Sequence, residues 1–138
     1  MDATEGYLTS ADTLKNNYPF YASHYDEMRL HYDEYYSRAL EVFKKTDGFY
    51  GALIAPSSYL FSTNGYRWAM DVSFLYLRHL ASAPHGIKDT LGGISLMLLT
   101  HAHGDHMEKD TVRALCDTDI LWVAPEFIAD KLLSLGVS

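Results

Sequence analysis

Residues 94–106 read Ile94-Ser95-Leu96-Met97-Leu98-Leu99-Thr100-His101-Ala102-His103-Gly104-Asp105-His106, an apolar run followed at once by three histidines and an aspartate. The apolar run predicts a strand. Side chains two residues apart in an extended chain point to the same side. His101 and His103, at the end of that strand, can therefore bind one divalent metal ion as a pair.

The next two metal-binding side chains follow a glycine. Gly104 allows the backbone to turn sharply, which would bring Asp105 and His106 round to a neighbouring position from another direction. The four side chains could bind one ion or two adjacent ions, and zinc, manganese and iron all accept imidazole and carboxylate ligands. The remaining histidines lack this spacing, so we interpret them as structural or surface residues: His24, His31, His79 and His85.

The stretch Leu98-Leu99-Thr100-His101-Ala102-His103-Gly104-Asp105-His106 resembles the signature of the metallo-β-lactamase-fold superfamily of metallohydrolases. Members of that superfamily include lactonases, glyoxalase II, tRNA-processing endonucleases and β-lactamases. The resemblance implies an αββα sandwich with the motif at the end of a strand on one edge. It also implies that His101 and His103 bind a first metal ion and that Asp105 and His106 bind a second. The four motif positions match completely, and flanking features agree more weakly over residues 50–138.

The resemblance also implies ligands that these 138 residues do not contain. Family members complete the first site with a downstream histidine, bridge the two ions with an aspartate and complete the second site with a further histidine. No histidine follows His106 here. The aspartates that do follow lie too close in sequence to bridge two ions: Asp110, Asp117, Asp119 and Asp130. We therefore expect residues 49–138 to be the N-terminal half of such a domain.

Hydrolysis is the activity that the resemblance implies. An ion held by His101 and His103 would lower the pKa of bound water towards about 7 and produce a metal-bound hydroxide. A second ion on Asp105 and His106 would stabilise negative charge on the attacked group. Asp105 could also orient the water or carry a proton, which makes it the predicted catalytic residue. The expected substrate is an ester, lactone, thioester or phosphoester of a small molecule. The alternative is a truncated, non-catalytic module that binds metal or assembles with a partner.

Composition narrows the class of partner. The 138 residues are 48% hydrophobic, which is enough for one domain with a core. The formal net charge of −7, without a basic face, argues against nucleic acid as a partner. A single cysteine and no leader-like start predict a cytoplasmic protein, and no run approaches the ~18 apolar residues of a membrane span. We interpret that cysteine, Cys116, as a core residue rather than a metal ligand.

Residues 1–48 are predicted to be a helical segment. Apolar and aromatic residues recur at helical spacing over residues 26–45, where Lys44 and Lys45 are stop signals, and a short helix is expected upstream within residues 10–18. Tyrosines at helix-packing intervals predict an interface with the sheet or with a second subunit, which would form a homo-oligomer: Tyr32, Tyr35 and Tyr36.

From residue 49 the pattern predicts strands, with short runs at 52–55, 58–62 and 66–70. Asn64-Gly65 between the last two is a strong hairpin signal. In the family that the motif resembles, an aspartate at the end of such a strand supports the ligand loop. Asp71, together with Thr100, is therefore predicted to contact the metal ligands rather than the metal. The other interpretation of Asp71 is an aspartate that simply ends a strand.

After the motif, helix and strand alternate. Residues 109–115 predict a helix, residues 120–124 a buried strand and residues 125–135 a helix with proline at its start and Gly136 just past its end. A short helix or turn is expected at 87–91, whereas 72–80 fit a helix or a strand. This alternation predicts an α/β fold.

Overall fold

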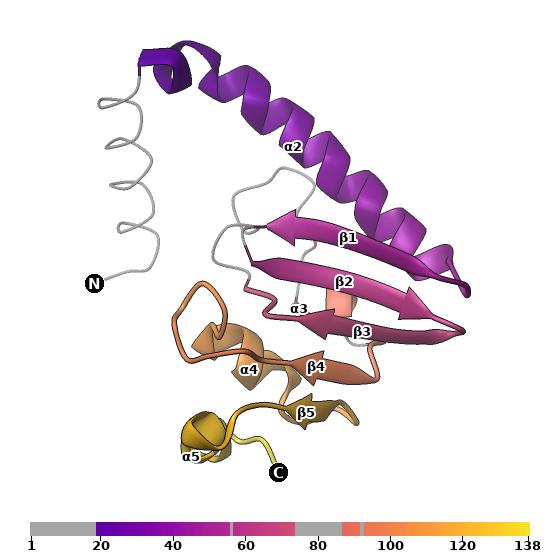
Figure 1. Ribbon diagram of the computed structural model, residues 1–138, viewed down its shortest axis with the longest axis vertical. Helices are drawn as coiled ribbons and strands as arrows, with labels where there is room; N and C mark the ends of the chain where they lie inside the picture. Colours follow the sequence, from indigo (N-terminus) through magenta and orange to yellow (C-terminus); the bar gives the residue numbers. More distant parts are fainter. Residues whose placement is uncertain (1–18, 56, 74–86, 92) are drawn as a thin grey trace.

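The computed structural model describes residues 19–55, 57–73, 87–91 and 93–138. These residues form four α-helices, one short 3-10 helix and a five-stranded mixed sheet, which confirms the α/β class (Figure 1). Within the described ranges all strands belong to that one sheet, in the order β1-β2-β3-β4-β5. The predicted short helix within residues 10–18 and most of the ambiguous stretch 72–80 lie outside the described residues.

The first described helix, α2, spans Pro19–Lys45 and runs alongside β1 (Figure 1). It starts earlier than the pattern indicated, with proline at its first position, where the missing amide hydrogen is harmless. Its predicted end is confirmed, with Lys44 and Lys45 in the last turn. The Arg67 guanidinium also closes this end, because it donates hydrogen bonds to the Phe43 and Lys44 carbonyl oxygens at 3.1 and 2.8 Å. Although α2 is 27 residues long, neither it nor any other described helix is apolar enough to cross a membrane.

The predicted hairpin is confirmed. Strands β1 (Tyr50–Ala55), β2 (Ser58–Thr63) and β3 (Tyr66–Met70) pair antiparallel. The turn between β2 and β3 has positive φ at Asn64 (50°) and at Gly65 (84°). This is the left-handed conformation that a two-residue hairpin turn requires and that asparagine and glycine accept most readily.

The second half of the sheet is parallel. Strands β4 (Leu96–Leu98) and β5 (Leu121–Val123) run parallel to β3 and are joined by helix α4 (Lys109–Leu115). Helix α3 (Ile87–Leu91) precedes β4, and a short 3-10 helix, η2 (Glu126–Ile128), leads into α5 (Ala129–Ser134). The prediction of a buried strand at 120–124 was wrong in its burial: Leu121 is 61% exposed and Val123 is 41% exposed. They lie on the face of β5 that points away from the core, and β5 is the edge strand of the sheet formed by the described residues.

The helices cover one face of the sheet. Residues paired across the strands place one row of side chains on that face, and these are buried or nearly so: Ala52, Leu60, Ala69, Met97 and Trp122. They pack with Phe43 of α2, Leu91 of α3 and Leu115 of α4 in the core. Burial of this apolar surface is the main term that favours folding.

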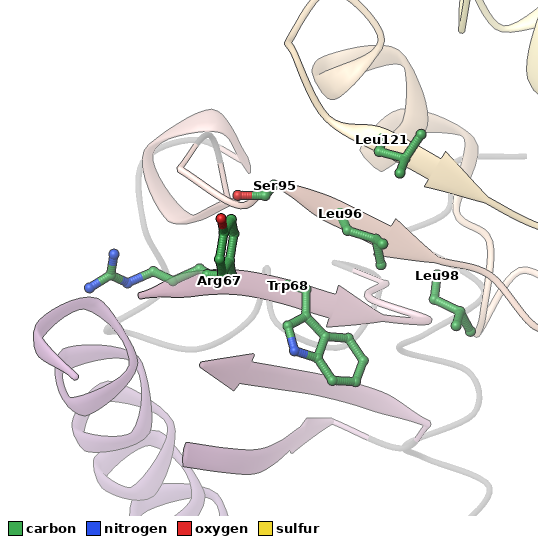
Figure 2. Close-up of a pocket in the computed structure, with 7 residues that line it drawn as sticks. Arg67, Trp68, Ser95, Leu96, Leu98 and Leu121 are labelled. Carbon is green, nitrogen blue, oxygen red and sulfur yellow. The ribbon is translucent and has the colours of Figure 1, made fainter. Parts of the chain in front are cut away.

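The opposite face of the sheet is apolar and partly exposed. We call it the open face; its residues are Leu53, Tyr59, Phe61, Trp68, Met70, Leu96, Leu98, Leu121 and Val123. Phe61 stacks on Trp68 with ring centroids 4.1 Å apart. A groove of about 460 Å³ lies on this face and is lined in part by Trp68, Leu96 and Leu121. Figure 2 shows these side chains. None of the four motif ligands lines the groove.

The tyrosines of α2 differ in their environments. Tyr36 is fully buried in the core beneath the sheet, whereas Tyr35 is 47% exposed. The packing of Tyr36 confirms an interface between α2 and the sheet, and the side chain of Tyr32 lies outside the described residues. Burial raises the pKa of Tyr36 to about 12, although the neighbouring Thr90 side chain offsets part of that rise.

Tyr36→Phe is expected to protect the fold at alkaline pH. The folded-state pKa of Tyr36 is raised from 10.0 to about 12, so the unfolded chain loses this proton first and stability falls as pH rises through that window. At pH 11 the loss amounts to about 1.4 kcal/mol, and below pH ~9 it vanishes. Urea unfolding at pH 8 and pH 11 should therefore show the variant gaining about 1.4 kcal/mol over wild type between the two values. The exposed Tyr66→Phe is the control, and an equal gain there would refute the assignment to Tyr36.

Candidate metal centre

The motif forms the loop between β4 and α4, at the end of the sheet where β3 and β4 finish (Figure 1). Buried side chains anchor both ends of this loop, Leu99 at 3% exposure and Met107 at 2%. The Leu99 amide also donates to the Val123 carbonyl oxygen at 2.8 Å. Loops at the carboxyl ends of parallel strands are where open α/β sheets bind ligands, because the strands hold them in place from one side. We call residues 99–107 the metal loop.

A tight turn places Asp105 within the metal loop. The amides of His106 and Met107 both donate to the His103 carbonyl oxygen, at 3.0 and 2.7 Å. The turn was expected at Gly104, but the expected reason was wrong. Gly104 does not have a positive φ, and a Cβ built there would meet nothing within 4 Å. The hydrogen bonds of the turn therefore determine its shape, and the conformational freedom of glycine is not needed.

Three of the four predicted ligands come together. The ligand atoms of His101, His103 and Asp105 all lie within 4.8 Å of one another. Ligand atoms around a tetrahedral zinc ion are about 3.4 Å apart, given bonds of about 2.1 Å. Small side-chain rotations would therefore place all three on one ion. Two imidazoles and a carboxylate form a donor set that fits zinc, manganese or iron.

His106 lies beside these three ligands, and its ring is hydrogen-bonded to Asp71. Its ring centroid is 3.7 Å from that of His101, and its Nε2 is 3.6 Å from Asp105 Oδ2. On the other side, its Nδ1 is 2.9 Å from Oδ2 of Asp71. The structure thus groups Asp105 with the His101–His103 pair and places His106 next to it.

Asp71 is the buried support of the metal loop. Its side chain is 4% exposed, its Oδ1 accepts a hydrogen bond from the Thr100 amide at 2.7 Å, and its Oδ2 accepts one from Thr100 Oγ1 at 2.6 Å. The residue has a φ of 52°, in the left-handed region, which costs roughly 1–2 kcal/mol for a residue other than glycine. A strained residue beside a ligand cluster is typical of functional sites. These contacts are those expected of a residue that orients metal ligands.

The hydrogen bonds of this support determine which imidazole nitrogen is free. A carboxylate only accepts, so His106 Nδ1 must carry the hydrogen that it shares with Asp71. Thr100 gives its single hydroxyl hydrogen to Asp71, so His101 Nδ1, 3.0 Å from Thr100 Oγ1, must donate as well. In the neutral rings of both histidines the lone pair therefore lies on Nε2. The support fixes the tautomer that presents Nε2 to a metal.

Two contacts to the metal loop had no signal in the sequence. Lys131 in α5 donates from Nζ to the Ala102 carbonyl oxygen at 3.2 Å, and the buried Ser73 donates from Oγ to the Gly104 carbonyl oxygen, also at 3.2 Å. Each partner is about 30 residues from the loop carbonyl that it contacts. Such pairs depend on how the chain folds back, which no local pattern encodes.

Other candidate ligands of the sequence lie elsewhere. His31 is exposed on α2 near Glu27 and Glu34, as a surface histidine. Cys116 contacts core residues and lies close to Gly136, apart from the cluster. Hydrogen bonding and charge from Lys88 lower the pKa of Asp117. The side chains of His24, His79 and His85 lie outside the described residues.

Fold and site together define a mixed α/β protein with a candidate metal centre of histidine and aspartate at one end of its sheet. The chain matches no protein-family model, and neither a curated protein nor a solved structure matches it. The likeness to metallo-β-lactamase-fold hydrolases therefore rests on the motif, with the ligand cluster as its structural counterpart.

Proposed function

We propose that this chain carries the metal-binding part of a hydrolase that acts on an ester, lactone, thioester or phosphoester of a small molecule. The observation that carries the proposal is the cluster of His101, His103 and Asp105, with ligand atoms within 4.8 Å, and with His106 held beside it by Asp71. A divalent ion bound there would make water acidic enough to act as a nucleophile near neutral pH, and would polarise the oxygen of the group under attack.

The residues divide into ligands, support and a group that can handle a proton. His101 and His106 present Nε2, because Thr100 and Asp71 occupy their Nδ1 atoms. The Asp105 side chain is 42% exposed, so it can accept a proton from a water molecule or orient a water molecule that enters from solvent. We propose two ions, preferably zinc with manganese or iron as alternatives. His101 and His103 would bind the first, and Asp105 and His106 the second.

The open face supports the αββα architecture. In a β-sandwich the inner faces of both sheets are apolar and pack about 10 Å apart. The open face has this character, with Phe61 stacked on Trp68 and with Leu121 and Val123 exposed. We propose that residues 49–138 form one half of such a sandwich, and that a second sheet covers this face.

The charge of the chain favours a small-molecule substrate. A net charge of −7 would repel a polyanion such as RNA, whose binding depends largely on basic side chains. A lactonase or a related esterase is accordingly the preferred activity, ahead of a nuclease or a β-lactamase. This preference rests on charge and on the resemblance of the motif.

A non-catalytic module that binds metal and assembles with a partner is the second candidate. The exposed apolar residues of the open face favour it, because contiguous apolar surface of this kind commonly marks a protein interface. Such a module would bind metal through the same cluster and hydrolyse nothing.

Hydrolysis by the natural gene product, from start codon to stop codon, tests the proposal. Purified protein is assayed against a panel of small esters, lactones, thioesters and phosphoesters, before and after removal of metal with a chelator. We expect turnover of one class to be lost on chelation and restored by Zn²⁺, Mn²⁺ or Fe²⁺. Metal binding without any turnover would favour the assembly module. Turnover that survives complete removal of metal would refute a metal-dependent mechanism.

A further inference from the structure

The buried hydroxyl of Ser58 contacts the backbone of Asp71 and of Ser73, the two residues whose side chains bond to the metal loop. Ser58 begins β2 and is fully buried. Its Oγ donates a hydrogen bond to the Asp71 carbonyl oxygen at 2.9 Å and accepts one from the Ser73 amide at 3.2 Å. The two partner atoms belong to the peptide groups on either side of residue 72. Ser58 therefore links the two ends of residues 71–73, where the chain leaves β3. We call these three residues the corner.

Two side chains of the corner, those of Asp71 and Ser73, contact the metal loop. Asp71 accepts hydrogen bonds from Thr100 and lies 2.9 Å from His106 Nδ1. Ser73, two residues on and fully buried, donates from Oγ to the Gly104 carbonyl oxygen. Asp71 thus contacts the start of the loop and its last ligand, and Ser73 contacts its turn. Their spacing depends on the conformation of the three residues that Ser58 clamps.

That conformation needs support. Asp71 has a φ of 52°, which an aspartate adopts only at a cost of roughly 1–2 kcal/mol. A relaxed backbone at Asp71 would turn its carboxylate away from Thr100 and His106. The Ser58 hydroxyl opposes that relaxation, because its loss would leave a buried carbonyl and a buried amide without this partner.

We propose that Ser58 is a positioning residue of the metal centre. It holds the corner at Asp71 and Ser73 in the one conformation that fixes the metal loop before an ion arrives. The inference rests on the proposed metal site, but the hold on the loop exists in the metal-free chain and can be measured there.

Ser62 provides a matched control for Ser58. It lies on the same strand and the same face and is 1% exposed, but its Oγ donates to the carbonyl oxygens of Thr46 and Gly48, beyond the end of α2. Ser58→Ala and Ser62→Ala each remove one buried hydroxyl from β2. A loss of general stability should therefore be similar for the two variants, whereas an effect on the metal loop should belong to Ser58→Ala alone.

The first measurement is hydrogen exchange of the Thr100 amide by NMR without metal, since this amide is bonded to Asp71. We expect Ser58→Ala to speed its exchange at least about fivefold and Ser62→Ala to leave it unchanged. The second is Zn²⁺ affinity by competition with a chelator, which we expect Ser58→Ala to weaken about threefold to tenfold. If Ser58→Ala does not fold, Ser58→Cys replaces it, because a thiol fills similar space but is a weak donor and acceptor.

Equal Thr100 exchange in the two serine variants would overturn the proposal. So would faster exchange in Ser58→Ala with unchanged Zn²⁺ affinity. A wild-type chain that binds none of Zn²⁺, Mn²⁺ and Fe²⁺ would refute the metal centre itself, and the exchange data would still decide whether Ser58 holds the loop.

Discussion

His103→Ala is expected to weaken Zn²⁺ binding at least about 100-fold while changing the free energy of unfolding of the metal-free chain by less than about 0.5 kcal/mol. His103 is exposed, and its described ring contact is an edge-on approach to His101 at 4.8 Å between centroids. Removal of the ring therefore opens no cavity in the core. It does take one ligand atom from the cluster, and a zinc ion that loses one of its few side-chain ligands is held far less tightly.

Chelator competition measures the affinity, and thermal unfolding with and without Zn²⁺ provides an independent readout. An ion that binds only the folded chain stabilises it by about 2.7 kcal/mol at 100 times its dissociation constant. Wild type should therefore gain in melting temperature with Zn²⁺, and His103→Ala should not. His31→Ala, which removes an exposed histidine on α2, is the matched control and should behave as wild type. Equal Zn²⁺ affinity in the two variants would rule His103 out as a ligand.

The features that sequence alone could predict are those with a local cause. The hairpin at Asn64-Gly65 follows from the backbone preferences of two residues, and both adopt the positive φ that the turn needs. The ligand cluster follows from spacing within a few residues after β4. The end of α2 was likewise evident from its last-turn lysines. In each case the signal and the structure lie within one short stretch of chain.

What could not be predicted depends on contacts between distant segments. The exposure of Leu121 follows from its place on the open face of the edge strand β5, which the apolar sequence of that strand does not encode. Ser58 and Lys131 reach the loop or its support only after the chain has folded back on itself. Gly104 shows the converse: glycine suggested a conformational need that the turn does not have. A residue type predicts local geometry only where the backbone conformation requires it.

Asp71→Asn is expected to weaken Zn²⁺ binding about 10-fold to 100-fold, although the side chain keeps its size. The amide oxygen of asparagine can still accept from the Thr100 amide, in place of Oδ1. The amide nitrogen then faces Thr100 Oγ1 and His106 Nδ1, in place of Oδ2. Because an amide nitrogen donates, His106 Nδ1 must become the acceptor and its hydrogen must move to Nε2. Thr100, now an acceptor from the amide, directs its own hydrogen to His101 Nδ1 and reverses that ring as well.

The substitution thus acts through the lone pairs of two ligands rather than through their positions. Long-range ¹H–¹⁵N spectra of the imidazoles distinguish the two tautomers, and chelator competition measures Zn²⁺ affinity in the same samples. We expect His101 and His106 to change from a lone pair on Nε2 to one on Nδ1, with a stability loss of about 1–2 kcal/mol. Asp117→Asn, at an exposed carboxylate paired with Lys88, should change neither the tautomers nor the affinity. Unchanged tautomers in Asp71→Asn together with wild-type affinity would show that the carboxylate is an ordinary strand-end residue. Reversed tautomers with a large loss of affinity would show that its second accepting oxygen determines which nitrogen the metal meets.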